Sequence, residues 1–368
     1  MGSLGTFVKG APLSKADISS DGTPFILYGE LYTTYSEVTY DVVRKTEKSV
    51  ESIQMSRVGD VIIPTSGETP EEIATATCVM TPGVILAGDL NIYRTKHIDG
   101  RFVSYLINHS VNNDISRIAQ GKSVVHIKAD ELAKICLSYP SAKEQEKILE
   151  FLAILNCRIE KQRRLVELLK SYKRGLLTHL FNRIHRFVGV YADWRKVTLG
   201  EVCEVIMGQS PDSSSYNSER KGVPLVQGNA DITDGITSPL RYTVQPTKIC
   251  DEKSVLISVR APVGTVARVN RTICIGRGMC AISASNLDYI YQYLLFIQNS
   301  WKAIEQGGTF TAISGDDIRS YPMEIPTDEE QMKIARFLTQ FDVQIALANK
   351  ELKHLCNLKL SFMQRLFI

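Results

Sequence analysis

The chain repeats its own sequence pattern after 186 residues: Gln120-Gly121 returns as Gln306-Gly307 without a gap. The other matched positions of the first copy are Ile127, Asp130, Pro140, Glu144, Gln145, Lys147, Ile148, Phe151, Leu152, Ile159, Leu180 and Phe181. Their counterparts are Ile313, Asp316, Pro326, Glu330, Gln331, Lys333, Ile334, Phe337, Leu338, Ile345, Leu366 and Phe367. The segments upstream of these blocks match far less well. This duplication predicts two similar scaffolds that present different surfaces.

Composition places the chain among ordinary core-forming proteins. Its 368 residues, 44% hydrophobic and 23% charged, give room for two domains. The eight cysteines form no Cys-x-x-Cys pair, and none of the six histidines completes a zinc spacing. We therefore expect reduced, buried thiols, a cytoplasmic location and no metal or cofactor. We find neither a secretory signal nor an apolar run long enough to cross a bilayer.

The charge is unevenly distributed along the chain. The formal net charge is +3, yet residues 143–186 carry 11 basic and 5 acidic side chains. The remaining segments are close to neutral or slightly acidic. A uniformly cationic surface is therefore absent, and any DNA contact must come from local patches.

Two long helices are predicted, the first over residues 144–181. Residues spaced alternately four and three apart are apolar at eight of ten positions in the first copy and nine of ten in the second. The apolar seam positions include Ile148, Leu152, Leu155, Ile159, Val166, Leu169, Ile334, Leu338, Phe341, Ile345, Leu352 and Leu355. Such a repeat over five heptads is typical of a coiled coil. Two matched seams favour mutual pairing over two amphipathic helices packed on separate cores.

The helix starts and two seam lysines also recur. Ser141 and Thr327 follow a proline and are expected to cap the helices, with Glu144 and Glu330 as capping-box partners. Lys173 and Lys359 share one late seam position, where a lysine can fix the register or extend to water.

The segments before each helix are β-rich and irregular. Short helices are expected at 99–109 and 288–300, with short strands between Gly and Pro residues. Corresponding landmarks are Leu4-Gly5 and Leu199-Gly200, Gly10 and Gly208, Pro24 and Pro224, and Val61 and Val255. We predict two similar α+β domains at 1–142 and 187–326, and long helices at 143–186 and 327–368.

The paired helix starts "PSAKEQEKI" and "PTDEEQMKI", the paired ends "LLTHLF" and "FMQRLF", and the opening "LGEVCEVIMGQSPDSSSYNSERKGVPLVQGNADI" carry a family resemblance. In this order, over nearly the whole chain, they resemble the specificity subunit of type I restriction–modification enzymes.

The resemblance implies a fold and a function. It implies two target recognition domains joined by two long antiparallel helices that form a coiled coil with pseudo-two-fold symmetry. Each domain would read one half of a split double-stranded DNA sequence. The helices would act as a ruler for the unread spacer. Two methyltransferase subunits would dock on the chain and bring restriction subunits with them.

The first copy departs from the second at its start. The second opens with "YADWRKVTLGEV", whereas only Met-Gly-Ser precedes the Leu-Gly of the first. This difference suggests a shortened N-terminus, and the chain ends are expected to lie near each other.

Base reading requires Arg, Lys, Asn or Gln at groove depth. The candidates are Arg44, Lys45, Lys48, Arg57, Arg94 and Lys96 in the first domain, and Gln227, Asn229, Arg260, Arg268, Arg271 and Arg277 in the second. Tyr28, Tyr32, Tyr35 and the loop 209–221 are further candidates. Without a DNA contact, the charged residues are explained as surface charge or local salt bridges, and the tyrosines as a half-buried strand face.

Two other functions remain open. Asp212 with Glu219-Arg220-Lys221 imitates the acidic pattern of a metal-dependent nuclease, although it lies in a Ser/Asn-rich loop. A coiled-coil scaffold that does not bind DNA is the other alternative. No Walker A motif, methyl-donor loop or Asn-Pro-Pro-aromatic motif is present, so we expect no catalysis by this chain alone.

Overall fold

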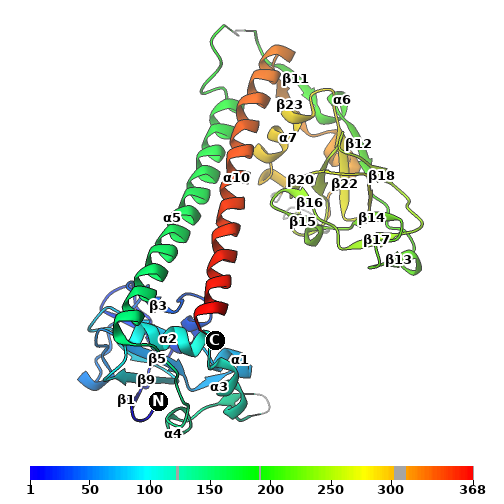
Figure 1. Cartoon of the computed structure of the whole chain (residues 1–368). Helices are drawn as coiled ribbons and strands as arrows, with labels where there is room; N and C mark the ends of the chain where they lie inside the picture. The colour runs from blue at the N-terminus through cyan, green and yellow to red at the C-terminus, as the bar shows by residue number, and fades with distance from the viewer. Residues whose placement is uncertain (122–123, 190–191, 302–311, 368) are drawn as a thin grey trace. The chain divides into compact units, whose positions relative to one another are not determined.

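The computed structural model describes residues 1–121, 124–189, 192–301 and 312–367. The repeated pair Gln306-Gly307 lies outside these residues. The chain divides into two compact units, Met1–Gln162 with Glu351–Ile368 and Arg163–Lys350. Each unit therefore contains one globular domain and parts of both long helices (Figure 1).

The first domain is built on two small sheets. The larger has the order β1-β9-β5-β7-β3, with strands Gly5–Lys9, Leu90–Thr95, Asp60–Pro64, Thr77–Val79 and Val38–Thr39. The smaller has the order β4-β2-β8, with strands Arg44–Thr46, Thr23–Leu27 and Ile85–Ala87. A third pair joins β6 (Ser66–Gly67) and β10 (Val125–His126). The helices are α1 (Pro70–Ile73), α2 (Gly100–His109), α3 (Asn112–Ile118) and α4 (Ala129–Leu132).

The second domain follows the same plan with longer sheets. One has the order β12-β22-β19-β20-β16-β15, with strands Glu204–Met207, Met279–Ser283, Val255–Ser258, Val266–Arg268, Ile236–Thr237 and Ile232–Thr233. The other has the order β13-β17-β14-β21-β18, with strands Tyr216–Asn217, Arg241–Thr243, Val223–Val226, Ile273–Ile275 and Ile249–Cys250. The domain also contains β11 (Arg195–Thr198), β23 (Pro322–Ile325), α6 (Leu199–Val202), α7 (Leu287–Phe296) and α9 (Gly315–Arg319).

Strand register confirms that the two domains are related. Val61 faces Tyr93 on the neighbouring strand, and Val255 faces Ile282 in the same way. The amide of Gly10 donates to the carbonyl of Leu90 at 2.9 Å, and that of Gly208 donates to Met279 at 2.9 Å. The corresponding strands β2 and β14 each have one antiparallel neighbour, β4 or β17, and one parallel neighbour, β8 or β21.

One predicted landmark is wrong. Gly5 lies in strand β1, whereas Gly200 lies in the short helix α6. Met1, and not Leu4, takes the place of Leu199. The amine of Met1 donates a hydrogen bond to the carbonyl of Ile135, and the amide of Leu199 donates one to the carbonyl of Tyr321, the residue that corresponds to Ile135. The side chains of Met1 and Leu199 are both buried. The shared Leu-Gly dipeptide therefore placed the alignment a few residues away from the structural correspondence.

The long helices are α5 (Ala142–Phe181) and α10 (Asp328–Leu366), which agrees with the predicted helical segments. In the first unit, Leu155 and Ile159 of α5 pack against Leu355 of α10. In the second unit, the ring of Tyr172 lies 5.6 Å from that of Phe341. The start of each helix therefore meets the end of the other, and the pair is antiparallel.

The outer turns of the seam pack on the domains as well as on the partner helix. Leu152 belongs to the buried cluster of the first domain, and Ile334 and Leu338 belong to that of the second. Val166 is buried, while Ile148, Leu169, Phe341, Ile345 and Leu352 are half-buried. The coiled-coil contact is thus central, and each helix start is anchored on its own domain.

The sequence also makes predictions about the start of α10, the cysteines and the length of apolar runs. Thr327 caps α10. The predicted capping-box acid Glu330 is buried and instead accepts hydrogen bonds from Arg186 and Trp194, which the tertiary fold places beside it. All eight cysteines are free, and Cys136 and Cys157 are exposed rather than buried. Among the described helices, none is long and apolar enough to span a membrane.

Candidate nucleic-acid interface

Four of the predicted DNA-contacting residues meet at one concave surface of the second domain. Gln227, Asn229, Arg260 and Arg277 line a groove of about 270 Å³ together with Ser210 and Gly278. They come from the ends of β12, β14 and β19 and from the turn between β21 and β22. We call this surface the second-domain groove.

Hydrogen bonds hold the two amide side chains in place. The carboxylate of Asp231 accepts from the amide of Gln227 at 2.7 Å and so caps the turn that follows β14. The side-chain nitrogen of Gln227 donates to the hydroxyl of Tyr216 at 2.9 Å. That of Asn229 donates to the carbonyl of Pro262 at 2.7 Å, while its oxygen has no partner within the described residues. The Asn229 amide is therefore held against the turn that contains Pro262, and its oxygen is buried.

The two arginines present positive charge that no acid among the described residues neutralises. Arg260 and Arg277 are exposed, and no carboxylate among the described residues forms an ion pair with either. The amide of Arg277 donates to the hydroxyl of Ser210 at 3.1 Å, which joins two of the strand ends. Close packing at Gly278 supports this turn, because a Cβ there would lie 2.2 Å from the carbonyl oxygen of Gln227.

This combination of groups suits the edge of a base pair. Guanidinium groups donate two hydrogen bonds to guanine, and Asn or Gln amides bind adenine by one donor and one acceptor. The unpaired guanidinium groups also attract phosphate. Recognition of a short DNA segment is the chemistry that this groove supports.

The other candidates of the second domain lie elsewhere. Arg268 pairs with Asp288 at 2.7 Å and lies over the ring of Tyr291 at 4.0 Å, so it stabilises the packing of α7. Arg271 is exposed and lines a separate depression of about 460 Å³ with Arg220.

The structure separates the candidates of the first domain. Arg94 is buried, pairs with Asp60 at 3.2 Å and donates to two loop carbonyls. The Arg94 guanidinium therefore joins Asp60 to the segment that contains Ile53 and Met55, and it does not face an interface. Lys45, Lys48, Arg57 and Lys96 are exposed but line no described groove. Arg44 does line one.

The residues of the nuclease-like pattern serve the backbone and the surface. Asp212 accepts from the amide of Ser214 at 2.8 Å, and these Ser214 hydrogen bonds lower the pKa of the Asp212 carboxyl. Glu219 is exposed and pairs with Lys221 at 2.6 Å. No group of three metal-ligating side chains occurs in the part of the chain that the structure describes.

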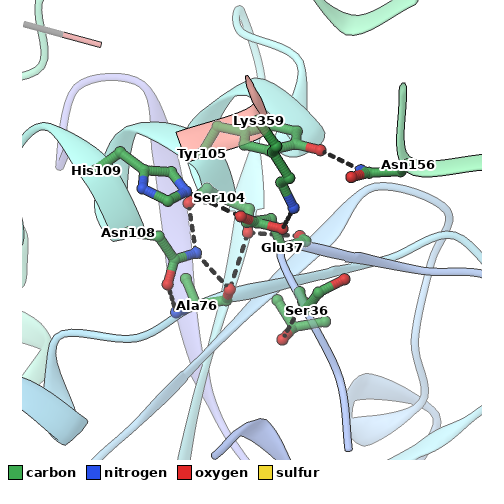
Figure 2. A network of polar contacts seen from close by, with 10 residues as sticks. Ser36, Glu37, Ala76, Ser104, Tyr105, Asn108, His109, Asn156 and Lys359 are labelled. Carbon is green, nitrogen blue, oxygen red and sulfur yellow. Dashed lines mark hydrogen bonds and ion pairs between the residues drawn. The ribbon is translucent and has the colours of Figure 1, made fainter. Parts of the chain in front are cut away.

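A polar network joins the first domain to the end of α10 (Figure 2). Glu37 accepts from Lys359 of α10 at 2.9 Å and contacts Nε2 of His109 at 2.9 Å. Burial alone would raise the pKa of Glu37, but the His109 hydrogen bond and the Lys359 charge lower it to about 2. Asn156 of α5 donates to the hydroxyl of Tyr105 at 2.9 Å. Both helices are thus tied to α2 of this domain.

In the second unit, the seam lysine that corresponds to Lys359 pairs with an acid of the other long helix. Lys173 of α5 pairs with Asp342 of α10, which also accepts a hydrogen bond from Gln292 of α7 at 2.6 Å. Burial lowers the pKa of Lys173, and Asp342 partly opposes this change. The recurring seam lysine therefore anchors a helix at each domain rather than extending to water.

Sequence reasoning missed the residues that position the Gln227 side chain. Tyr216 and Asp231 orient Gln227, yet neither belongs to a recognisable motif. The only local signal was the turn-forming stretch 227–231, in which an acid follows the amide by four residues.

Residues 191–357 match the family described as the type I restriction modification DNA specificity domain. The chain is 32% identical over 276 residues to a putative type I restriction enzyme MjaX specificity subunit of Methanocaldococcus jannaschii, covering 69% of this chain and 64% of that protein. It is 24% identical over 195 residues to the MjaIX specificity subunit of the same organism, covering 48% and 44%. The matched segments thus span less than two thirds of these relatives.

Solved structures agree over the full length. A chain described under "Structural basis underlying complex assembly and conformational transition of the type I R-M system" is 26% identical, with a TM-score of 0.58 and coverage of 99% of this chain and 97% of that one. The S subunit of a type I restriction-modification system from M. genitalium shares the fold, with a TM-score of 0.67, 16% identity and coverage of 100% and 94%.

Proposed function

Since this chain belongs to the family of type I restriction–modification DNA specificity subunits, we propose that it reads a two-part DNA sequence and catalyses no reaction itself. Residues 1–142 and 187–326 would be the two target recognition domains. One observation carries the proposal: the second-domain groove gathers the Gln227 and Asn229 side chains with two exposed arginines, Arg260 and Arg277, that form no ion pair with an acid among the described residues. These are the side chains that discriminate base edges in duplex DNA.

The antiparallel helices would hold the two domains at a set spacing, because a coiled coil bends little. Two methyltransferase subunits would dock on the chain in the cytoplasm, and restriction subunits would join through them. The solved relative described under complex assembly of a type I system supports an assembly of this kind.

The alternatives have less support. A metal-dependent nuclease needs clustered acids, and Asp212 and Glu219 are instead occupied by Ser214 and Lys221. A scaffold without DNA binding would not require unpaired arginines beside fixed amides. A salt-sensitive shift of duplex DNA by the assembled complex separates the scaffold from a DNA-reading subunit.

We predict that Arg277→Ala relaxes recognition at one base pair of one half-site. The loss of a guanidinium that reads a base edge lowers discrimination there by about 1–3 kcal/mol, or roughly 5- to 150-fold. Methylome sequencing of cells that carry the variant with its methyltransferase measures this directly. Arg271→Ala is the matched control, because it removes an exposed arginine of the same domain outside the groove.

Loss of discrimination in both halves, or equal loss with Arg271→Ala, would contradict this assignment. A uniform loss of affinity for all sequences would identify Arg277 as a phosphate contact instead. Exchange of residues 187–326 for those of a related subunit should alter one half-site and leave the other intact.

A further inference from the structure

The first domain has a groove at the position that corresponds to the second-domain groove. Its volume is about 740 Å³, and its lining includes Lys9, Lys15, Leu27, Tyr28, Glu30 and Arg44. We call it the first-domain groove. Of the six basic candidates predicted from the sequence for this domain, only Arg44 lines it.

Backbone hydrogen bonds establish that the grooves correspond. The amide of Ala11 donates to the carbonyl of Leu86 at 2.8 Å, as that of Gln209 donates to Ile275 at 2.9 Å. After the central strand, the amide of Leu27 donates to the carboxylate of Glu30 at 2.9 Å. The amide of Gln227 donates to Asp231 in the same way, so Leu27 takes the place of Gln227.

The base-reading groups of the second-domain groove are absent at the matching positions. The strand alignment places Leu27 at Gln227 and Gly88 at Arg277. The segment from Leu27 to Glu30 is one residue shorter than that from Gln227 to Asp231 and contains only Tyr28 and Gly29, so it has no counterpart of the Asn229 amide. Ser66 takes the place of Arg260. Ser66 forms a β-bridge with His126, and Arg260 forms the corresponding bridge with Ala312. The hydroxyl of Ser66 donates to Asp89 at 3.0 Å. The two grooves therefore recognise different chemistry.

The first-domain groove offers one oriented arginine instead. Nε of Arg44 donates to Glu30 at 2.7 Å, and the Glu30 side chain is only 5% exposed. This contact fixes the guanidinium plane. No described residue accepts a hydrogen bond from its two terminal nitrogens, and the side chain is 41% exposed. A guanidinium that is fixed through Nε can use its two terminal nitrogens to donate hydrogen bonds to two acceptors on one base.

Two lysines complete the rim. Lys9 and Lys15 are exposed, and no carboxylate in the described residues forms an ion pair with either. Their point charges suit phosphate oxygens, which give affinity without sequence information.

We propose that Arg44, positioned by Glu30, is the base-reading residue of the first half-site and that guanine is its target. This inference rests on the proposed function. Lys9 and Lys15 contact the backbone phosphates of the same half-site. Guanine is the target because only its major-groove edge presents two neighbouring acceptors to a guanidinium fork.

Arg241 provides a matched control within the same chain. Arg44 faces Phe25 on the central strand, and Arg241 faces Leu225 at the corresponding position of the second domain. Arg241 is exposed, pairs with no acid in the described residues and does not line the second-domain groove. The two arginines thus share a sheet position, but only Arg44 is oriented by a carboxylate among the described residues.

The test uses the full chain with its methyltransferase, and methylome sequencing as the readout. Arg44→Ala should make one G·C pair of one half-site degenerate, with discrimination there reduced at least tenfold. Arg44→Lys should show the same loss, since lysine keeps the charge but not the fork. Glu30→Gln should weaken discrimination at that same pair only. Arg241→Ala should leave both half-sites unchanged.

Salt dependence separates the lysines from Arg44. Lys15→Ala should weaken binding to all sequences and lower the slope of affinity against salt by about one. A change of base preference with Lys15→Ala would overturn its assignment to phosphate.

The outcomes distinguish this inference from the proposed function. An unchanged motif with folded Arg44→Lys overturns the role of Arg44, even if exchange of residues 187–326 still alters the other half-site. A degenerate position that is an A·T pair overturns guanine as the target. If neither domain exchange nor any groove variant changes the motif, the proposed function itself fails.

Discussion

Replacing Lys359 by methionine will lower the free energy of unfolding of the first unit by about 3 kcal/mol, because the buried Glu37 carboxylate then loses the lysine charge and keeps only its contact with His109. The Glu37 side chain is 10% exposed and that of Lys359 is 20% exposed, so solvent screens the pair only weakly. Urea denaturation, followed by hydrogen exchange of the α2 amides, measures the change.

A double variant tests the cause. Glu37→Gln together with Lys359→Met should recover most of the lost stability, since neither charge then remains in the protein interior. Strictly additive losses would show that packing of the lysine stem, and not the ion pair, accounts for the effect.

Glu37 also predicts a dependence on pH, because its hydrogen bond with His109 and the charge of Lys359 together lower the pKa of its carboxyl. The pKa of Glu37 is about 2 in the folded chain and about 4.3 in an unfolded one. Its contribution is therefore fully present above about pH 5 and is lost as the pH falls toward 2. The shift corresponds to about 3 kcal/mol, so acid should destabilise the parent chain more than the double variant.

Inserting one heptad into both long helices will shift the preferred spacer between the half-sites. Duplication of residues 155–161 and 350–356 retains the seam, since Leu155, Ile159 and Leu355 pack in one cluster there. Seven residues add about 10 Å of helix, which equals about three base pairs of duplex. The original site should lose at least 100-fold in affinity in a binding assay with the assembled complex.

A spacer series gives the decisive comparison. The site longer by three base pairs should bind best, although more weakly than the original pair, because three base pairs also turn the groove by about a third of a turn. Insertion into α5 alone is the control, since it breaks the match between the two seams. An unchanged spacer preference in the folded double insertion would rule out a ruler role for the helices.

The residues that sequence reasoning located correctly are those with a local pattern. The helical segments are recognisable because every third or fourth residue must be apolar to form the seam, whatever the rest of the chain does. The strands β19 and β22 are recognisable because a buried strand is a short apolar run between turns.

The residues that it misjudged have partners far away in the chain. Arg94 is an ordinary charged residue by pattern, and only Asp60 on another strand explains its burial. Glu330 resembles a capping residue, but Arg186 reaches it from 144 residues away. Such pairings depend on which strands and helices become neighbours, and no local spacing encodes that.

The sequence by itself determined the duplication, the two long helices and the two β-rich domains, because repeats and apolar periodicity are properties of neighbouring residues. Tertiary structure alone decided which polar side chains meet. Ser210 and Arg277 share a groove across 67 residues of chain, and Glu30 selects Arg44 over five other basic candidates. Strand ends from separate parts of the chain converge at each groove, so the groove side chains come together only when the sheets form.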